Sequence, residues 1–424
     1  MTSIPSVHPR PYRMQNPIQP YAWGTHDGEA FIPRLLGIAP QPGAPYAELW
    51  MGAHPKAPSA VIVEGNSVPL DRWIAAHPTE VLGRAVAARF ANRLPFLFKV
   101  LSAGEVLSIQ AHPNKAQAEA LHARDPENYP DDNHKPELAV ALDSLTALMG
   151  IKPHAGIVEA LERYPELAGF IGQAVCDELW QAGGATEAER WQAARRAFAA
   201  LVERSVSAER ELAQVIDALA ARLSRTPGDL REEERLFLDL RAEYPGADVG
   251  LPAILLLNLV HLTEGQGMFI AAGMPHAYVR GNIIECMANS DNVVRVGLTP
   301  KFKDAQALVE ILNREPQPIA ILSGGDAAEI VYHTPAREFQ VSRWRMRPGE
   351  ERSGASGGRL EILLVTQGEA RLRWGDETET FRQGESILIP ALLDEFIVRA
   401  ESPVELFRAE VPRVDGSRGL GSRK

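Results

Sequence analysis

Cysteine is scarce in this sequence, and its scarcity argues against two kinds of architecture. Cys176 and Cys286 are the two cysteines among 424 residues, and they lie far apart in no metal-binding or redox spacing. A disulfide framework is therefore excluded, and a metal site made of thiolates is not expected. Such cysteine usage is typical of a reducing compartment, which predicts a cytoplasmic protein.

Long hydrophobic runs and an excess of positive charge are also missing. The densest apolar stretch, residues 252–260, is too short to span a bilayer and contains Asn258. Residues 1–17 are rich in proline and lack the apolar segment of a secretory signal. The formal net charge of −11 argues against nucleic-acid and membrane partners, since both attract a basic surface. We therefore expect a soluble enzyme that acts on a small molecule.

The pattern of apolar residues divides the chain, which is longer than one domain usually is. Up to residue 152, short runs rich in aromatic and β-branched residues alternate with glycine and proline, as in strands. After residue 153, apolar residues recur every three or four positions among alanine, glutamate and arginine, which predicts amphipathic helices. Strand patterns return at residue 252. We therefore predict a mainly β protein with an α insertion: a discontinuous β-domain (1–152 with 252–325), a helical insertion domain (153–251) and a C-terminal β-domain (326–424).

Three local signals refine this division. Pro113-Asn114 is an N-cap signal that predicts a helix over residues 114–124. The run GESILIPA (residues 384–391) resembles the second half of a cupin, or small jelly-roll, signature. The C-terminal β-domain contains no histidine beyond His333, so we expect it to be structural and to hold no histidine-based metal site. The polar tail, residues 414–424, is predicted to be mobile.

Four polar residues could together bind a metal ion. Gln110 and His112 are two positions apart, so on a strand both side chains share one face, at about 7 Å between Cα atoms. Glu137 and His276 add a carboxylate and a second imidazole. This set suits catalytic Zn²⁺, and also Mn²⁺, Fe²⁺ or Co²⁺. The ligands carry one negative charge against the two positive charges of the ion, so the centre would favour an anionic substrate.

Each of these pieces is weak evidence by itself. A Gln-x-His pair is common, and a glutamate beside a lysine, as in Lys135 to Glu137, is more often a surface ion pair. His276 follows a proline and could simply donate to a carbonyl in a turn. The residues alone therefore leave the metal site open.

Several segments, taken in order, are more specific than any one of them. The runs LPFLFKVLSAGEVLSIQAHPNK (94–115), DNHKPE (132–137), PHAY (275–278) and ECMANSDNVVRVGLTPKFKD (285–304) resemble the type I mannose-6-phosphate isomerases. QPYAWG (19–24) and AELWMGAHPKAPS (47–59) are similar to that family too. The resemblance covers nearly the whole chain. It implies two cupin-like (jelly-roll) β-domains, the first of them catalytic, and a helical domain. It also implies the interconversion of D-mannose 6-phosphate and D-fructose 6-phosphate through a cis-enediol, feeding mannose and GDP-mannose metabolism.

The resemblance also implies a role for each residue that matches the family's motifs. One Zn²⁺ per chain would be held by Gln110, His112, Glu137 and His276, and Arg295 would be the essential arginine, which we expect to stabilise the enediolate.

Other roles follow from the chemistry that such a reaction needs. Lys135 and Glu285 are candidates for the acid/base group, and the sequence does not decide between them. Ser108 and Lys99 are candidates for binding the phosphate. Lys99 lies in the apolar run Phe96–Leu101, where an unpaired charge would be costly unless it had a function.

Two other classes of protein are alternatives to an isomerase. A different cupin metalloenzyme usually gathers an His-x-His pair, a glutamate and a later histidine within one compact barrel, whereas Gln110 stands first here and the helical insertion separates His276 from the rest. A non-catalytic sugar-binding protein would be marked by loss of a ligand or of Arg295, and none is lost. We expect a monomer whose partner is a sugar phosphate.

Overall fold

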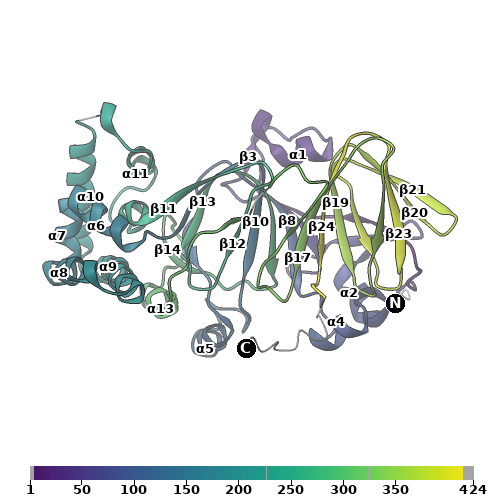
Figure 1. Ribbon diagram of the computed structural model, residues 1–424, viewed down its shortest axis with the longest axis horizontal. Coiled ribbons are helices and arrows are strands. Elements are labelled where there is room, and N and C mark those ends of the chain that lie inside the picture. Colours follow the sequence, from purple (N-terminus) through teal and green to yellow (C-terminus); the bar gives the residue numbers. More distant parts are fainter. Residues whose placement is uncertain (1–3, 226, 323, 414–424) are drawn as a thin grey trace, which may run out of the picture.

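The computed structural model describes residues 4–225, 227–322 and 324–413. Helices lie at one end of the molecule, a β-barrel lies in the middle, and a second β-unit lies at the other end (Figure 1). The tail predicted to be mobile, residues 414–424, lies outside the described residues. In the described part, no helix is long and apolar enough to cross a membrane.

The central barrel is a ten-stranded sheet. Its main path runs β15-β12-β10-β13-β8-β5-β2, with β11 paired to β10, and β9 paired to both β13 and β14. The strands are β2 (Ile18–Gln19), β5 (Glu48–Gly52), β8 (Phe96–Ala103), β9 (Ile109–Ala111), β10 (Glu137–Ile151), β11 (Leu257–Thr263), β12 (Gly267–Ile270), β13 (His276–Ala288), β14 (Val294–Gly297) and β15 (Ile321–Leu322).

The helix predicted over residues 114–124 is confirmed as α5 (Lys115–Arg124). Asn114 Oδ1 accepts a hydrogen bond from the Gln117 backbone at 3.0 Å, and Gln117 Oε1 accepts one from the Asn114 backbone at 2.9 Å. This capping box satisfies two amide groups that a helix start otherwise leaves without partners. It therefore fixes where the chain turns after His112.

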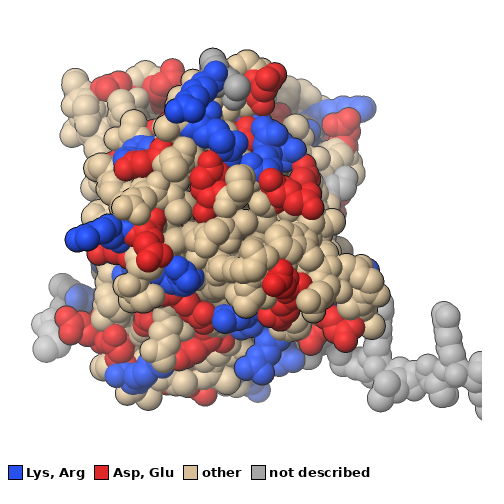
Figure 2. Space-filling view, turned by 90° about the vertical axis from the view of Figure 1, so that its left-hand side faces the viewer, with Lys and Arg blue, Asp and Glu red and all other residues tan. Residues whose placement is uncertain are grey.

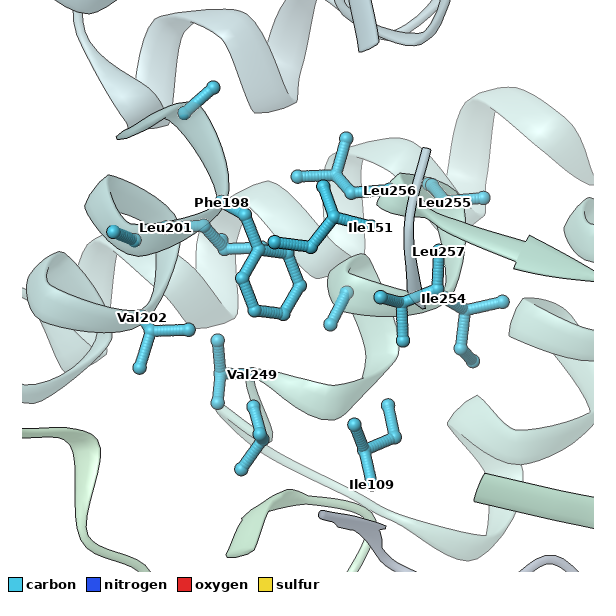
Figure 3. Packing of buried hydrophobic residues seen from close by; sticks show 14 of the residues in the cluster. Ile109, Ile151, Phe198, Leu201, Val202, Val249, Ile254, Leu255, Leu256 and Leu257 are labelled. Atoms are coloured by element: carbon cyan, nitrogen blue, oxygen red, sulfur yellow. The ribbon is translucent and has the colours of Figure 1, made fainter. Parts of the chain in front are cut away.

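The segment predicted to be helical forms a layer of helices against the barrel. These are α6 (His154–Arg163), α7 (Pro165–Ile171), α8 (Gln173–Gln181), α9 (Glu187–Ser207), α10 (Glu209–Leu223), α11 (Glu232–Glu243) and α12 (Gly250–Ala253). Phe198, Leu201 and Val202 of α9 belong to the same buried cluster as Ile109 and Ile151 of the barrel (Figure 3). The outer surface of this end mixes acidic and basic side chains (Figure 2). The helices thus bury their apolar stripe on the strands and expose a charged one.

The remaining helices are short. They are α1 (Phe31–Leu36), α2 (Leu70–Ala76), α3 (Pro78–Leu82), α4 (Arg84–Arg89) and α13 (Ala305–Ile311), and a small ladder joins β3 (Thr25–His26) to β4 (Pro45–Tyr46).

The second β-unit consists of two sheets. The larger runs β16 (Glu329–Tyr332), β17 (Gln340–Met346), β24 (Val404–Glu410), β19 (Glu361–Gln367), β22 (Ser386–Ile389), β1 (Tyr12–Gln15), β6 (Ala60–Val63) and β7 (Asn66–Pro69). The smaller runs β18 (Glu351–Ala355), β23 (Glu395–Ala400), β20 (Glu369–Trp374) and β21 (Glu377–Arg382). The mainly β fold with a helical insertion is therefore confirmed. The domain boundaries stay a prediction, and one sheet crosses them, because β1 pairs with β22 through Tyr12 and Leu388.

A single buried cluster joins the two β-units. Phe98 of β8 and Ile284 of β13 belong to it, together with Phe339 and Phe407 of the second unit. Successive side chains of a strand point to opposite faces. Phe98 and Val100 therefore face this shared core, while Lys99 between them points into the barrel.

Candidate metal centre and active site

Three predicted ligands meet inside the barrel. Ligand atoms of His112, Glu137 and His276 all lie within 4.8 Å of one another, and the three residues are buried. Each imidazole Nε2 is 3.4 Å from one carboxylate oxygen of Glu137. Glu137 and His276 sit at opposite ends of the β10–β13 ladder, where they pair with Met287 and Met149. The sheet must therefore curl to bring their side chains together.

Backbone carbonyl groups fix both imidazole rings. His112 Nδ1 lies 2.9 Å from the Asn292 carbonyl oxygen, and His276 Nδ1 lies 2.9 Å from that of Met274. A carbonyl only accepts, so each ring donates from Nδ1 and presents the lone pair of Nε2 to Glu137. Burial lowers the pKa of His112 to about 4, which keeps this ring neutral near pH 7.

The arrangement fits a divalent cation. Both Nε2 atoms are buried and have no hydrogen-bond partner within the described part of the chain. Two buried acceptors facing a carboxylate are costly by themselves, but each gains a ligand bond if a metal ion lies between them. The donors are two imidazole nitrogens and a carboxylate, a set found in catalytic zinc sites. The donor atoms and their orientation therefore fit the ligand requirements of a zinc ion.

Gln110 lies on the same face of the sheet as His276. It pairs directly with His276 of β13 on one side and with Arg295 of β14 on the other. Directly paired residues of neighbouring strands point to the same face. Their chain neighbours Ile109 and Val294 belong to the cluster shared with the helices (Figure 3). The helices thus support the back of the strands whose front carries Gln110 and Arg295.

Two cations border this face. Lys135 Nζ lies 3.3 Å from Glu137 Oε1. Arg295 is half-buried, and burial lowers the pKa of its guanidinium. Among the described residues, no carboxylate forms an ion pair with Arg295, so its charge is available to a substrate.

One premise of the sequence analysis was wrong. Lys99 is not an unpaired charge: its Nζ lies 2.7 Å from Glu285 Oε2 and 3.6 Å from Glu48 Oε2. Lys99 and Glu285 are cross-strand neighbours on β8 and β13. Burial lowers the pKa of Lys99, but Glu285 and Glu48 raise it by more, so the net shift is upward. This pairing could not be predicted from the sequence, because β8 and β13 are far apart in the chain.

Glu285 and Ser108 differ in how firmly their side chains are held. Glu285 also accepts a hydrogen bond from the Tyr278 hydroxyl at 2.9 Å, so both its oxygens are engaged. Ser108 is half-buried in the loop before β9, and no side-chain hydrogen bond from it is found among the described residues. In the described part of the chain, no hydrogen bond joins Ser108 to Lys99.

A network of hydrogen bonds in the loops behind His112 was not predicted from the sequence. Asn292 Nδ2 donates to the carbonyl oxygens of Asp131, at 2.6 Å, and Asn133, at 3.0 Å. Ser290 Oγ donates to Asp131 Oδ1 at 2.8 Å. These bonds join the loop before Glu137 to the loop before Arg295. The run of Asn, Ser and Asp over residues 289–292 was the available signal, since such residues bond to nearby backbone.

Comparison with known proteins gives consistent results. A model of the catalytic domain of type I phosphomannose isomerase matches residues 12–154. Mannose-6-phosphate isomerase of Mus musculus is 39% identical over 378 residues, which cover 85% of this chain and 88% of that protein. The enzyme of Schizosaccharomyces pombe is 35% identical, over 94% of this chain and 99% of its own.

Solved structures are similar over the same range. Mannose 6-phosphate isomerase of Salmonella typhimurium, bound to fructose 6-phosphate and zinc, has a TM-score of 0.80 and 34% identity, covering 95% of this chain and 100% of that chain. A mannose 6-phosphate isomerase bound with zinc and yttrium has the same TM-score, identity and coverage.

Proposed function

The chain belongs to the type I mannose-6-phosphate isomerase family and interconverts mannose 6-phosphate and fructose 6-phosphate with zinc, and we propose that His112, Glu137 and His276 hold this zinc. Gln110 is the proposed fourth ligand. The observation that carries the proposal is the pair of buried Nε2 atoms turned toward Glu137 without a hydrogen-bond partner in the described chain. The pairing of Gln110 with His276 supports its place in the set.

The reaction moves a proton between C2 and C1 of the open-chain sugar through a cis-enediol. When bound, zinc supplies Lewis-acid polarisation of the sugar oxygens. We propose that Arg295 stabilises the negative oxygen that develops as the proton leaves carbon. Support comes from its position beside Gln110 on the same face and from its free charge.

Lys135 and Glu285 remain the proposed acid/base groups, and their contacts suit different tasks. Lys135 lies 3.3 Å from Glu137 and is 11% exposed, so its ammonium can reach a substrate and donate a proton. Glu285 is held by Lys99 and Tyr278, which fixes the direction of a carboxylate that could accept one.

Ser108 and Lys99 are the proposed phosphate contacts. The surroundings support Ser108 more than Lys99. Ser108 lies two residues before Gln110 and is partly accessible. Lys99 is 5% exposed and already neutralised by Glu285 and Glu48, so it attracts an additional anion weakly.

We also propose a division into domains, an oligomeric state and a cellular compartment. The barrel of residues 1–152 and 252–325 is the catalytic domain, residues 153–251 are an insertion, and residues 326–424 form the C-terminal domain. A monomer that binds a sugar phosphate is part of the same proposal, and size-exclusion chromatography with light scattering tests it. Cys176 and Cys286 are free and buried, which supports the cytoplasm as the compartment.

One experiment tests the central assignment. The purified protein should contain one zinc per chain and convert mannose 6-phosphate in a coupled assay, lose activity on chelation, and regain it with zinc. The double variant His112→Ala, His276→Ala should contain no metal. His122→Ala is the matched control, because His122 bonds to the Tyr129 carbonyl and lies outside the ligand group. Two metals per chain, or metal retained by the double variant, would contradict the site.

A further inference from the structure

The second β-unit contains a cavity of about 520 Å³ that is separate from the metal centre. Strands β16, β17, β18 and β24 contribute to its wall, together with Arg359 and Arg413. Its volume is in the usual range for small-molecule sites. Arg352, Arg359, Arg408 and Arg413 all line it.

The cavity lies where the interior of this unit changes from apolar to charged. Trp344, Leu363 and Leu406 belong to the apolar core between the two sheets. Arg408 and Glu410 follow Leu406 at every second position, so they point to the same inner face. Buried charges are unfavourable compared with an apolar core, which makes this half of the interior unusual.

The charged residues form ion pairs that leave some groups without partners. Arg408 Nη2 lies 2.6 Å from Glu361 Oε1 and 3.0 Å from Glu410 Oε2, and Arg359 Nη2 lies 2.7 Å from Glu410 Oε2. Arg359 is 8% exposed. Its Nε, the Nε of Arg408 and Glu361 Oε2 are buried with no hydrogen-bond partner among the described residues. A network with a purely structural role is expected to satisfy these groups.

The wall of the cavity carries an excess of positive charge. Four arginines face two lining glutamates, Glu329 and Glu410. Glu361 lies behind them and is paired with Arg408, and burial raises the pKa of its carboxyl group. Two guanidinium groups lie over the Trp344 ring, Arg352 at 5.2 Å and Arg408 at 5.7 Å from its centroid. Such cation–π contacts hold the groups in place, and Arg352 Nη1 also lies 2.7 Å from Glu329 Oε2. The four arginines therefore share three carboxylates, Glu329, Glu361 and Glu410.

We propose that this cavity binds a small phosphorylated polyol or sugar. Guanidinium groups match the geometry of a phosphate. Arg359 and Arg408 use Nη2 for their ion pairs, and among the described residues no hydrogen bond engages the Nη1 of either. Glu329, Ser342 and Gln340 line the same space and can accept hydrogen bonds from ligand hydroxyl groups. His333 is the only ring of a general acid/base type in the described lining, and no metal-ligating group of histidines, cysteines and carboxylates is found there. The cavity is therefore a binding site and not a second reaction centre.

Sorbitol 6-phosphate is a suitable probe, because it is a phosphorylated polyol with no carbonyl group to isomerise. Titration calorimetry on the zinc-loaded full chain is expected to show two binding events, one at the metal centre and one at the cavity. Arg295→Ala should weaken the first, whereas Arg359→Gln and Arg413→Ala should each weaken the second by roughly tenfold to a hundredfold. Unphosphorylated sorbitol should not occupy the cavity.

Matched variants separate the cavity from general effects of charge. Arg371→Ala removes one positive charge from the exposed face of strand β20, where Arg371 pairs with Glu401, and should leave both events unchanged. Arg413 is exposed, so Arg413→Ala tests the cavity even if Arg359→Gln fails to fold. The cavity variants should keep the wild-type kcat and KM for mannose 6-phosphate. A single binding event in the wild type, or a second event that survives both variants, would overturn the proposal and leave the isomerase assignment untouched.

Discussion

At the scale of single residues, the site depends on which atom of each side chain is left free. Arg295 is the clearest case, because it is half-buried on the same face as Gln110 and His276 and has no carboxylate partner in the described structure. Its charge is therefore available to a substrate bound at the proposed site. Lys99, in contrast, has its charge taken up by Glu285 and Glu48.

Arg295→Ala is therefore expected to lower kcat by about 10²–10³, the usual effect of losing an electrostatic stabiliser of a developing oxyanion. Arg295→Lys should restore little, since an ammonium on a flexible chain does not reproduce a planar donor set. Steady-state kinetics on both variants, with zinc content measured in parallel, checks this. A raised KM with kcat nearly unchanged would instead identify Arg295 as a phosphate contact that binds substrate and transition state equally.

Asn292 shows how a residue outside the proposed ligand set can position a member of that set. Its carbonyl orients His112, and its side chain anchors the loop through Asp131 and Asn133. Asn292→Ala should weaken zinc binding by about 10- to 100-fold, as loss of groups that orient a ligand typically does. Competition with a chelator of known affinity measures the effect. Asn289→Ala is the control, because Asn289 Nδ2 bonds to the Leu94 carbonyl, and equal losses in both variants would argue for general loosening of the loop.

At the scale of secondary structure, the sequence pattern correctly predicted those elements that depend on interactions between residues close together in the chain. The capping residue Asn114 predicted the start of α5, and apolar residues at three- and four-residue spacing predicted the helical insertion. The pairing of strands could not be predicted in the same way. β1 lies beside β22 and Lys99 beside Glu285, and in both cases the partner is far away in the sequence. Alternation along a strand says that one face is buried, but it does not say which strand lies alongside.

The same alternation links the helical insertion to the site. In β9, Ile109 and Ala111 face the cluster shared with α9, and Gln110 points the other way. In β14, Val294 and Val296 belong to that cluster on either side of Arg295. The insertion carries none of the predicted ligands. Its apolar core nevertheless packs behind β9 and β14 and so fixes the position of the two strands that carry Gln110 and Arg295.

Ile109→Ala tests this support. Removing a fully buried side chain should cost about 2–5 kcal/mol of stability through loss of packing and the cavity left behind. We expect it also to weaken zinc binding, because β9 can then shift beneath Gln110. Leu363→Ala is the matched control, since Leu363 is equally buried but belongs to the core of the C-terminal unit. Denaturant unfolding and chelator competition on both variants give the comparison, and unchanged zinc affinity in Ile109→Ala would contradict the linkage.

At the scale of the whole molecule, the two β-units are built as one body. β1, β6 and β7 from the N-terminal part extend the sheet of the C-terminal unit. Phe98 and Ile284 of the barrel share a buried cluster with Phe339 and Phe407. The hydrogen bond between His134 Nε2 and Glu338 Oε1, at 3.0 Å, adds a contact between the loop before Glu137 and the second unit. Separating the units would expose this shared apolar core to water, which is strongly unfavourable.

Thermal unfolding should therefore report on both units at once. A ligand that binds only the folded state stabilises everything that unfolds with its site, so removal of zinc should lower the Tm of the whole cooperative transition by a few degrees. Scanning calorimetry before and after chelation measures this shift. The double variant His112→Ala, His276→Ala should show no shift on chelation, because it has lost the ion already. If the C-terminal unit instead gave a second transition that stayed fixed when zinc was removed, the shared core would not couple the units.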